Sequence, residues 1–190
     1  MTPWLFDTQA LLWLNFDGGG LVDTLMWWIS GKWTWVPLYA AVVAWVFWRK
    51  GWRTGVLFVV AASLMILCAD QTASFFKHAL PKFRPTHNPE IAPMVHTVGG
   101  YLGGLYGTVS SHAANSLAFM LLSSSVVRNR YYTVLMLLWV VALCYSRLYL
   151  GVHFPMDIIF GLLDGALWGS FWWVVYKNMA KKHYICRLKS

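Results

Sequence analysis

Charged side chains are scarce in this chain of 190 residues. Lys, Arg, Asp and Glu together make up 12% of it, whereas hydrophobic residues make up 58%. In a soluble domain about a quarter of the residues are charged. This composition therefore excludes a soluble protein in which a polar surface covers a large core. Several apolar stretches reach the roughly 20 residues that a helix needs to cross a bilayer. The sequence therefore predicts an all-α, polytopic membrane helix bundle in a single domain, 1–190.

Cysteine and acidic residues are few as well, and neither indicates a metal centre or a disulfide framework. The cysteines Cys68, Cys144 and Cys186 share no metal-ligand spacing, and the first two lie in apolar runs, where cysteine acts as a small packing residue. Seven acidic residues oppose 15 basic ones, which gives a net charge of +8. Such a balance often indicates nucleic-acid binding, but here the basic residues cluster at the ends of apolar segments. We therefore expect the lipid bilayer, and no nucleic acid, as the partner.

The apolar stretches predict about five transmembrane helices plus an N-terminal interfacial helix. The first stretch, 3–16 within residues 1–20, is too short to span and favours a helix that lies on the bilayer. No basic residues precede it, so it is not typical of a secretory signal peptide. The predicted spans cover about 23–48, 54–77, 110–127, 131–146 and 155–176. Ser30-Gly31-Lys32 interrupts the first of them, so its outer end is expected to be irregular. A polar loop rich in Pro and Gly occupies 78–108, and a basic tail occupies 177–190.

The distribution of Lys and Arg orients these spans. Ten of the 15 basic residues lie at one set of span ends, among them Arg49, Lys50, Arg128 and Arg130. Cytoplasmic loops of membrane proteins carry the excess of Lys and Arg, so this side and the C-terminus are predicted to be cytoplasmic. The loop 78–108 then faces the outside. In a bacterial inner membrane, we expect an active site on that loop to face the periplasm.

Three stretches with chemically useful side chains fall on the outer side. The first contains Lys77, Arg84 and Pro85. Two cations held near the membrane surface by a Pro-stiffened turn suit a phosphate better than a neutral ligand. The alternative for Lys77 is a cation that only extends to the interface from the end of a span.

The second stretch leads from the Gly-rich segment 99–107 into the third predicted span. A Gly-rich approach to a helix start leaves backbone N–H groups free to face an anion, and Ser110 can add a hydroxyl group. His112 follows in the first turn. A single histidine at such a place is more often an interfacial residue than a catalyst, so its meaning depends on its neighbours.

The third stretch contains Arg147, His153 and Asp157. Asp157 follows His153 by four residues, the spacing that places two side chains on one helical face, and Pro155 is well placed to open the fifth helix. A carboxylate that accepts a hydrogen bond from one ring nitrogen fixes the tautomer and frees the other nitrogen for attack. The alternatives are a structural pair and a metal-ligand pair. A metal site would need more ligands, and the nearby cations would repel the ion.

Together these residues resemble a known family. The patterns Lys77–x6–Arg84-Pro85, Ser110-Ser111-His112 and Arg147–x5–His153–x3–Asp157 look like the three-part signature of the type 2 phosphatidic acid phosphatase (PAP2) superfamily, and the chain is similar to its undecaprenyl-diphosphate phosphatases. The resemblance covers roughly 70–160. The central motif of the family usually reads Pro-Ser-Gly-His. Val109 and Ser111 stand here in place of Pro and Gly, so the tightness of that turn around a phosphate is in question.

The resemblance implies a metal-independent phosphatase without a cofactor. His153 would attack phosphorus and form a phosphohistidine, Asp157 would orient it, and His112 would protonate the leaving oxygen and then activate water. The phosphate-binding residues would be Lys77, Arg84, Ser110, Ser111 and Arg147. Activity is therefore expected to survive a chelator.

The implied substrate is a phosphate or diphosphate on a membrane lipid, because the active site would lie at the bilayer surface. Undecaprenyl diphosphate, a carrier for cell envelope synthesis, is the best guess within the family. Phosphatidylglycerol phosphate and lipid A phosphates are alternatives, since the motifs recognise the phosphate and not the tail. A lipid phosphotransferase would use the same intermediate. A transporter or lipid-binding protein would not need the two histidines and the aspartate, and no obligate protein partner is implied.

Residues outside the signature also need an interpretation. Asp70 and Asp164 lie inside predicted spans, where acids are often functional, and for Asp70 we favour a structural ion pair. His87 and His96 could contact a lipid head group, although solvated loop histidines are commoner. An aromatic belt at the outer interface would account for Trp27, Trp28, Trp33 and Trp35.

Overall fold

The computed structural model describes the backbone of residues 3–188 and the side chains of residues 5–181. The end of the predicted basic tail, 182–190, and Cys186 therefore lie outside the described side chains. The helices are α1 (Pro3–Leu14), α2 (Gly19–Ser30), α3 (Val36–Lys50), α4 (Trp52–Ala79), α5 (Ser111–Val127), α6 (Arg130–Tyr149) and α7 (Pro155–Leu188), with 3₁₀ turns at Trp33–Trp35, Pro85–His87 and Ala92–Met94. Residues 3–188 contain no strand, only an isolated bridge between Phe83 and Tyr106. The all-α prediction is confirmed.

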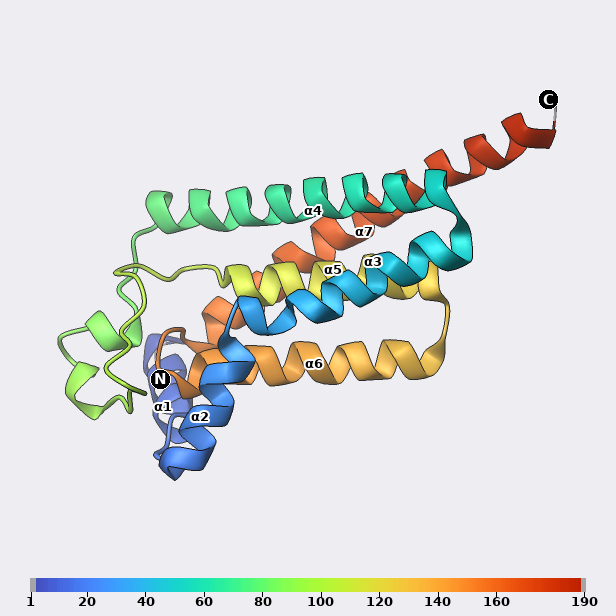
Figure 1. Ribbon diagram of the computed structural model, residues 1–190. Helices are drawn as coiled ribbons and strands as arrows, with labels where there is room; N and C mark the ends of the chain where they lie inside the picture. The colour runs from blue at the N-terminus through green and yellow to red at the C-terminus, as the bar shows by residue number, and fades with distance from the viewer. Residues whose placement is uncertain (1–2, 189–190) are drawn as a thin grey trace.

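Helix α5 is the centre of the bundle, where it packs against α4, α6 and α7 (Figure 1). Its closest neighbour is α7, because three glycines spaced four residues apart on α7 face it. A Cβ at Gly161 would lie 2.5 Å from the carbonyl oxygen of Ser110, and one at Gly165 would lie 2.3 Å from that of Ala114. Gly169 meets the backbone of Ala118 in the same way. Such a row of small residues lets two helices approach closely in a membrane protein.

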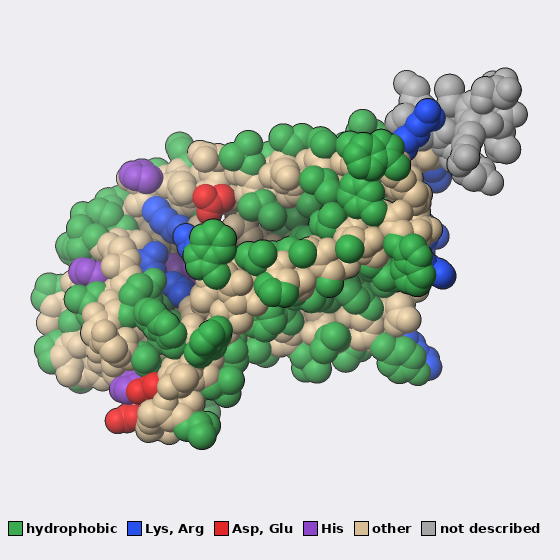
Figure 2. All heavy atoms as spheres, in the orientation of Figure 1, with side chains coloured by type: hydrophobic (Ala, Val, Ile, Leu, Met, Phe, Trp, Pro, Cys, Tyr) green, Lys and Arg blue, Asp and Glu red, His purple; other side chains and the backbone are tan. Residues whose placement is uncertain are grey.

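The middle of the bundle has the apolar surface of a membrane protein. Helices α4, α6 and α7 up to Lys181 are long and apolar enough to cross a bilayer. Large hydrophobic side chains of these helices are exposed outside the cavities, for example Val60, Leu135 and Phe171. Figure 2 shows hydrophobic side chains over the middle of this face and Lys and Arg side chains toward its ends. An exposed apolar belt of this kind fits lipid rather than water.

The predicted count of five spanning helices is not confirmed. The stretch predicted as the first span, 23–48, is divided into α2 and α3 by the segment from Gly31 to the turn Trp33–Trp35. Helix α3 has 15 residues and α5 has 17. Among the described residues, only α4, α6 and α7 meet the length and hydropathy expected of a span. The predicted bounds of the next three spans agree with α4, α5 and α6 to within three residues. The start of α7 agrees as well, but the helix continues to Leu188, well beyond the predicted end at 176.

Helices α1 and α2 lie at the same end of the bundle as the loop that joins α4 to α5 (Figure 1). Helix α1 packs on α6 and α7, and its inner face buries Asp7, Leu11 and Asn15, which follow each other at intervals of four. The Asn15 amide nitrogen donates to the carbonyl oxygens of His96 at 3.1 Å and Tyr149 at 2.6 Å. The predicted N-terminal helix is thus present, with one face anchored to the bundle.

Candidate active site

A cavity of about 820 Å³ opens between α3, α4, α5 and α6, toward the end of the bundle that carries the loop from α4 to α5. Its lining brings together side chains from all three stretches that the sequence singled out: Lys77, Arg84, Ser111, His112, Arg147 and His153. Figure 2 shows Lys, Arg and His side chains gathered in a hollow at this end of the molecule. Positive charge and imidazole groups therefore converge on one space.

His153 lies in the short loop before α7, with only 1% of its surface exposed. Its Nδ1 faces Asp157 Oδ2 at 3.4 Å, and the same oxygen accepts a hydrogen bond from the N–H of Phe154 at 3.0 Å. With Nδ1 directed at the carboxylate, Nε2 is the ring nitrogen available to a substrate. Burial, and then the positive charges of Arg84 and Arg147, hold the pKa of His153 well below its ordinary value. The imidazole is therefore neutral at pH 7, the form that a nucleophile requires.

Hydrogen bonds hold the cations of the cavity in place and leave some of their N–H groups available to a ligand. Lys77 Nζ donates to Ser111 Oγ at 2.8 Å. Arg84 donates from Nε to the carbonyl oxygen of Tyr106 at 3.0 Å and from Nη1 to that of Val152 at 3.1 Å. Lysine and arginine so placed can hold the oxygens of a phosphoryl group.

Arg147, the third cation, comes from the last turn of α6 and is 4% exposed. Its Nη1 donates to Ser30 Oγ at the end of α2, while its Nε is buried without a partner among the described residues. A buried guanidinium with an unused donor is costly unless an anion pairs with it. This arrangement indicates that an anionic ligand belongs in the cavity.

The two serines of the central motif differ in position. Ser111 is the first residue of α5 and lines the cavity with negative φ, so this position does not need the backbone of a glycine. Ser110 precedes the helix, and its backbone N–H donates to the carbonyl oxygen of Asp157 at 3.0 Å. Its hydroxyl group is fully buried outside the cavity lining, without a partner among the described residues. The predicted contact between Ser110 and phosphate therefore stays a prediction, and the structure places this hydroxyl at the contact of α5 with α7.

Several residues of the site were not predicted from the sequence. Lys32 and Tyr101 line the cavity, and Lys82 binds the carboxylate of Asp157. Lys32 lies in the break between α2 and α3. A lysine beside a glycine within an otherwise apolar stretch was the available signal. Lys82 lies between Lys77 and Arg84 but does not belong to the family signature, so the sequence pattern did not single it out.

The predictions for residues outside the signature have mixed outcomes. Asp70 lines the cavity near Lys77, on which its charge acts, but it forms no ion pair within 4 Å among the described residues, so the favoured structural ion pair is not confirmed. Asp164 lines a separate apolar cavity of about 400 Å³ between α4 and α7. Trp35 is not part of an exposed belt, because its Nε1 donates to the carbonyl oxygen of Ile29 at 2.7 Å and its ring packs on Trp139.

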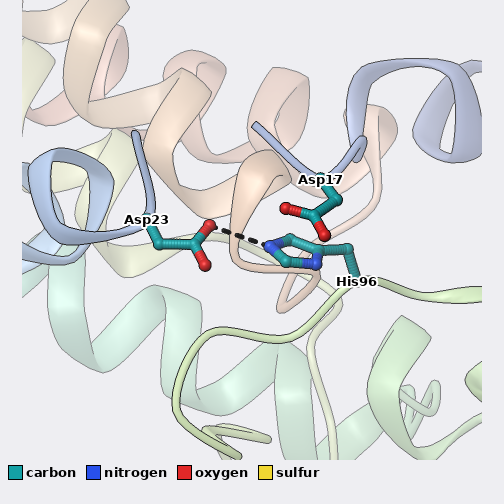
Figure 3. A group of neighbouring side chains, drawn as sticks. All are labelled: Asp17, Asp23 and His96. Atoms are coloured by element: carbon teal, nitrogen blue, oxygen red, sulfur yellow. Dashed lines mark hydrogen bonds and ion pairs between the residues drawn. The ribbon is translucent and has the colours of Figure 1, made fainter. Parts of the chain in front are cut away.

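His96 does not line the cavity but takes part in a junction between the outer loop and α2. Its Nε2 lies 2.9 Å from Asp23 Oδ1, an oxygen that also accepts a hydrogen bond from Tyr149 at 2.6 Å. Asp17 lies beside them, and Figure 3 shows the three side chains Asp17, Asp23 and His96 pointing toward one another. The hydrogen bonds to Asp23 hold its pKa below the ordinary value. This group fastens the loop to α2 and α6.

Gly107 offers a test of how tightly the cavity wall is packed. A Cβ at this position would lie 2.8 Å from Arg84 Cγ and 3.3 Å from His153 Nδ1. We expect Gly107→Ala to displace both side chains and to lower kcat/KM about tenfold or more, measured as phosphate release. Gly104→Ala is the matched control, because a Cβ there meets no atom within 4 Å. Equal activities of the two variants would contradict this expectation.

Comparisons with known proteins agree with this geometry. Residues 52–181 match the family model of the PAP2 superfamily. A lipid A 4'-phosphatase of Porphyromonas gingivalis is 38% identical over 176 residues, which cover 91% of this chain and 75% of the relative. A lipid A 4'-phosphatase of Bacteroides thetaiotaomicron is 36% identical over 179 residues, which cover 92% and 79% of the two chains.

Two crystal structures share the fold at 19% sequence identity. LpxE of Aquifex aeolicus has a TM-score of 0.64 over 87% of this chain and 93% of its own. The transmembrane PAP2 type phosphatidylglycerolphosphate phosphatase of Bacillus subtilis has a TM-score of 0.66 over 96% and 88%. The fold, the cavity and the family match agree, and the chain belongs to the PAP2 superfamily as a membrane lipid-phosphate phosphatase.

Proposed function

We propose that this protein removes a phosphate group from lipid A, or from a glycolipid of that type, through a phosphohistidine on His153. The observation that carries the proposal is the convergence of His153, His112 and the four cations Lys32, Lys77, Arg84 and Arg147 on one cavity. Both curated relatives are named lipid A 4'-phosphatases, which supports this alternative better than undecaprenyl diphosphate, the best guess from the sequence. The active site is proposed to face the periplasm from the inner membrane, with the C-terminus in the cytoplasm.

The proposed reaction uses these side chains in two steps. His153 Nε2 attacks phosphorus in line, a nitrogen–phosphorus bond forms, and the bond from phosphorus to the lipid oxygen breaks. His112 gives its proton to that oxygen. Water then attacks phosphorus as His112 takes a proton from it, the nitrogen–phosphorus bond to His153 breaks, and inorganic phosphate leaves. Lys77, Arg84 and Arg147 hold the phosphoryl oxygens in both steps, which is the electrostatic task that metal ions perform in other phosphatases.

The depth of the cavity supports a lipid as the substrate. Lys77 and Ser63 of α4 both line it, and 14 residues of helix separate them, about 21 Å along the axis. The cavity thus extends from the cations at the outer end of α4 toward the middle of the apolar belt. A phosphate on a hydrophobic anchor can place its head among the cations while the remainder stays in the bilayer.

A substrate panel tests the proposal. Protein purified in detergent is assayed for release of inorganic phosphate from lipid A, phosphatidylglycerol phosphate and undecaprenyl diphosphate, with His153→Ala as the inactive control. We expect kcat/KM for lipid A to exceed the others by about tenfold or more, a difference of roughly 1.4 kcal/mol in transition-state binding. A preference for undecaprenyl diphosphate would contradict the proposed substrate. A phosphorylated lipid product without free phosphate would favour the phosphotransferase.

A further inference from the structure

The carboxylate that faces His153 is held by two residues outside the family signature. Lys82 Nζ lies 3.1 Å from Asp157 Oδ1 and 3.2 Å from Asp7 Oδ2. The same ammonium group lies over the ring of Phe154, 4.1 Å from its centroid. Lys82 belongs to the loop after α4, whereas Asp7 belongs to α1 and Asp157 to the first turn of α7. One lysine therefore joins the first helix, the outer loop and the last helix.

Asp7 also holds the start of α7. It is 3% exposed, and its Oδ1 accepts a hydrogen bond from the backbone N–H of Met156 at 2.9 Å. The first N–H groups of a helix have no partner within the helix, so a carboxylate oxygen that accepts from them stabilises the helix end. Here the carboxylate comes from another helix and binds the residue directly before Asp157. The position of α1 is thereby coupled to the position of the nucleophile.

Asp157 depends on these contacts because it is 1% exposed. A buried carboxylate without a positive partner carries a large desolvation penalty. Lys82 binds its Oδ1, while the N–H of Phe154 binds its Oδ2, so both oxygens are held and the carboxylate plane is fixed. As His153 Nε2 bonds to phosphorus, positive charge builds on the imidazole ring. A negatively charged Asp157 opposite Nδ1 stabilises that charge.

We propose that Lys82 and Asp7 are positioning residues for the nucleophile: Lys82 holds Asp157 toward His153, and Asp7 holds Lys82 and the start of α7 in place. This inference rests on the role of His153 in the proposed function. Asp7, Lys82 and Asp157 are absent from the lining of the cavity, in contrast to Lys77 and Arg147. The network therefore acts on the chemical step and leaves phosphate binding to the cations of the cavity. Helix α1, which contributes Asp7, is accordingly part of the structure that holds the nucleophile in position.

Lys82→Met and Lys82→Arg test the proposal in the full chain with lipid A as substrate. Lys82→Met removes the charge, and we expect kcat to fall about tenfold or more. KM, and the inhibition constant of inorganic phosphate, should stay within about twofold of the wild type, because the cations of the cavity remain. Lys82→Arg keeps the charge and should retain kcat to within about threefold. An unchanged kcat in Lys82→Met overturns the proposal, as does weakened phosphate binding at unchanged kcat.

Asp7→Asn gives a second test if Lys82→Met does not fold. The amide oxygen of asparagine still accepts from Met156 N–H, so the helix end is kept, while the negative charge that pairs with Lys82 is lost. We expect kcat to fall about threefold or more at unchanged KM, and a wild-type kcat overturns the proposal. Asp17→Asn is the matched control, because Asp17 is an exposed acid in the same region. His153→Ala is assayed in parallel: if it stays active, the proposed function fails, whereas an inactive His153→Ala beside normal Lys82 and Asp7 variants refutes only the network.

Discussion

His153→Ala is expected to lower kcat for phosphate release from a lipid substrate by about four orders of magnitude. Alanine leaves Lys77, Arg84 and Arg147 in the cavity, so the substrate phosphate still binds. The variant lacks the imidazole ring that Asp157 orients through Nδ1. Without its Nε2, no nitrogen–phosphorus bond can form. The measurement is single-turnover phosphate release at saturating lipid.

The control must show that the loss is chemical and not structural. His78→Ala is a suitable matched variant, because His78 is exposed near the outer end of α4 and lies outside the cavity lining. It should keep the kcat of the wild type. His153→Ala should keep the melting temperature and the affinity for inorganic phosphate. A folded His153→Ala variant with kcat within about tenfold of the wild type would refute the nucleophile assignment.

His112→Ala is expected to lower kcat for lipid substrates by about 10²- to 10⁴-fold, the usual contribution of a general acid or base. His112 lies in the first turn of α5 and lines the same cavity as His153. The alkoxide of a sugar or alcohol is a poor leaving group without a proton. A substrate such as p-nitrophenyl phosphate, whose leaving group needs no proton, should form the phosphoenzyme at a nearly normal rate.

The two substrates together separate the roles of His112. With p-nitrophenyl phosphate, His112→Ala should release a burst of p-nitrophenol and then stall, because the base that activates water is missing. The phosphoenzyme should accumulate. An equal loss of the burst rate with both substrates would show that His112 binds phosphate rather than transferring protons.

The fold was predictable where the sequence pattern alone determines it. Uninterrupted apolar runs bounded by basic residues defined α4, α5 and α6 to within three residues and the start of α7, which continues to Leu188. The interruption of the stretch 23–48 at Ser30-Gly31-Lys32 was visible in the sequence, but its division into two separate helices was not predicted, because that division depends on contacts across the chain. Trp35 Nε1 binds the carbonyl oxygen of Ile29, and Arg147 binds Ser30 at the end of α2. Hydropathy contains no information about such partners.

The site was predictable within each stretch and less so between stretches. The spacing of His153 and Asp157 anticipated their contact, and the family signature brought His112 to the same cavity. The position of the Ser110 hydroxyl depends on how closely the glycines of α7 approach α5, which no local spacing encodes.

The ion pairs of Lys82 with Asp7 and Asp157 each join residues 75 positions apart, so no local motif could indicate them. The available signal was Asp7 itself, an acid on the face of an apolar helix that also carries Leu11 and Asn15. That face is buried in the structure. A polar position on the inner face of a predicted interfacial helix should therefore be examined for a partner in the active site.

The most direct test of the central claim is to identify the residue that carries the phosphoryl group. The protein is mixed with lipid A labelled in its phosphate groups, quenched in alkali within the first turnover, digested and analysed by mass spectrometry. A phosphohistidine is stable in alkali and labile in acid, so the label should survive the quench and map to His153. It should be lost on mild acid treatment, and with p-nitrophenyl phosphate as the substrate it should be more abundant in His112→Ala. Turnover without any labelled histidine, or a label on another residue, would contradict the account.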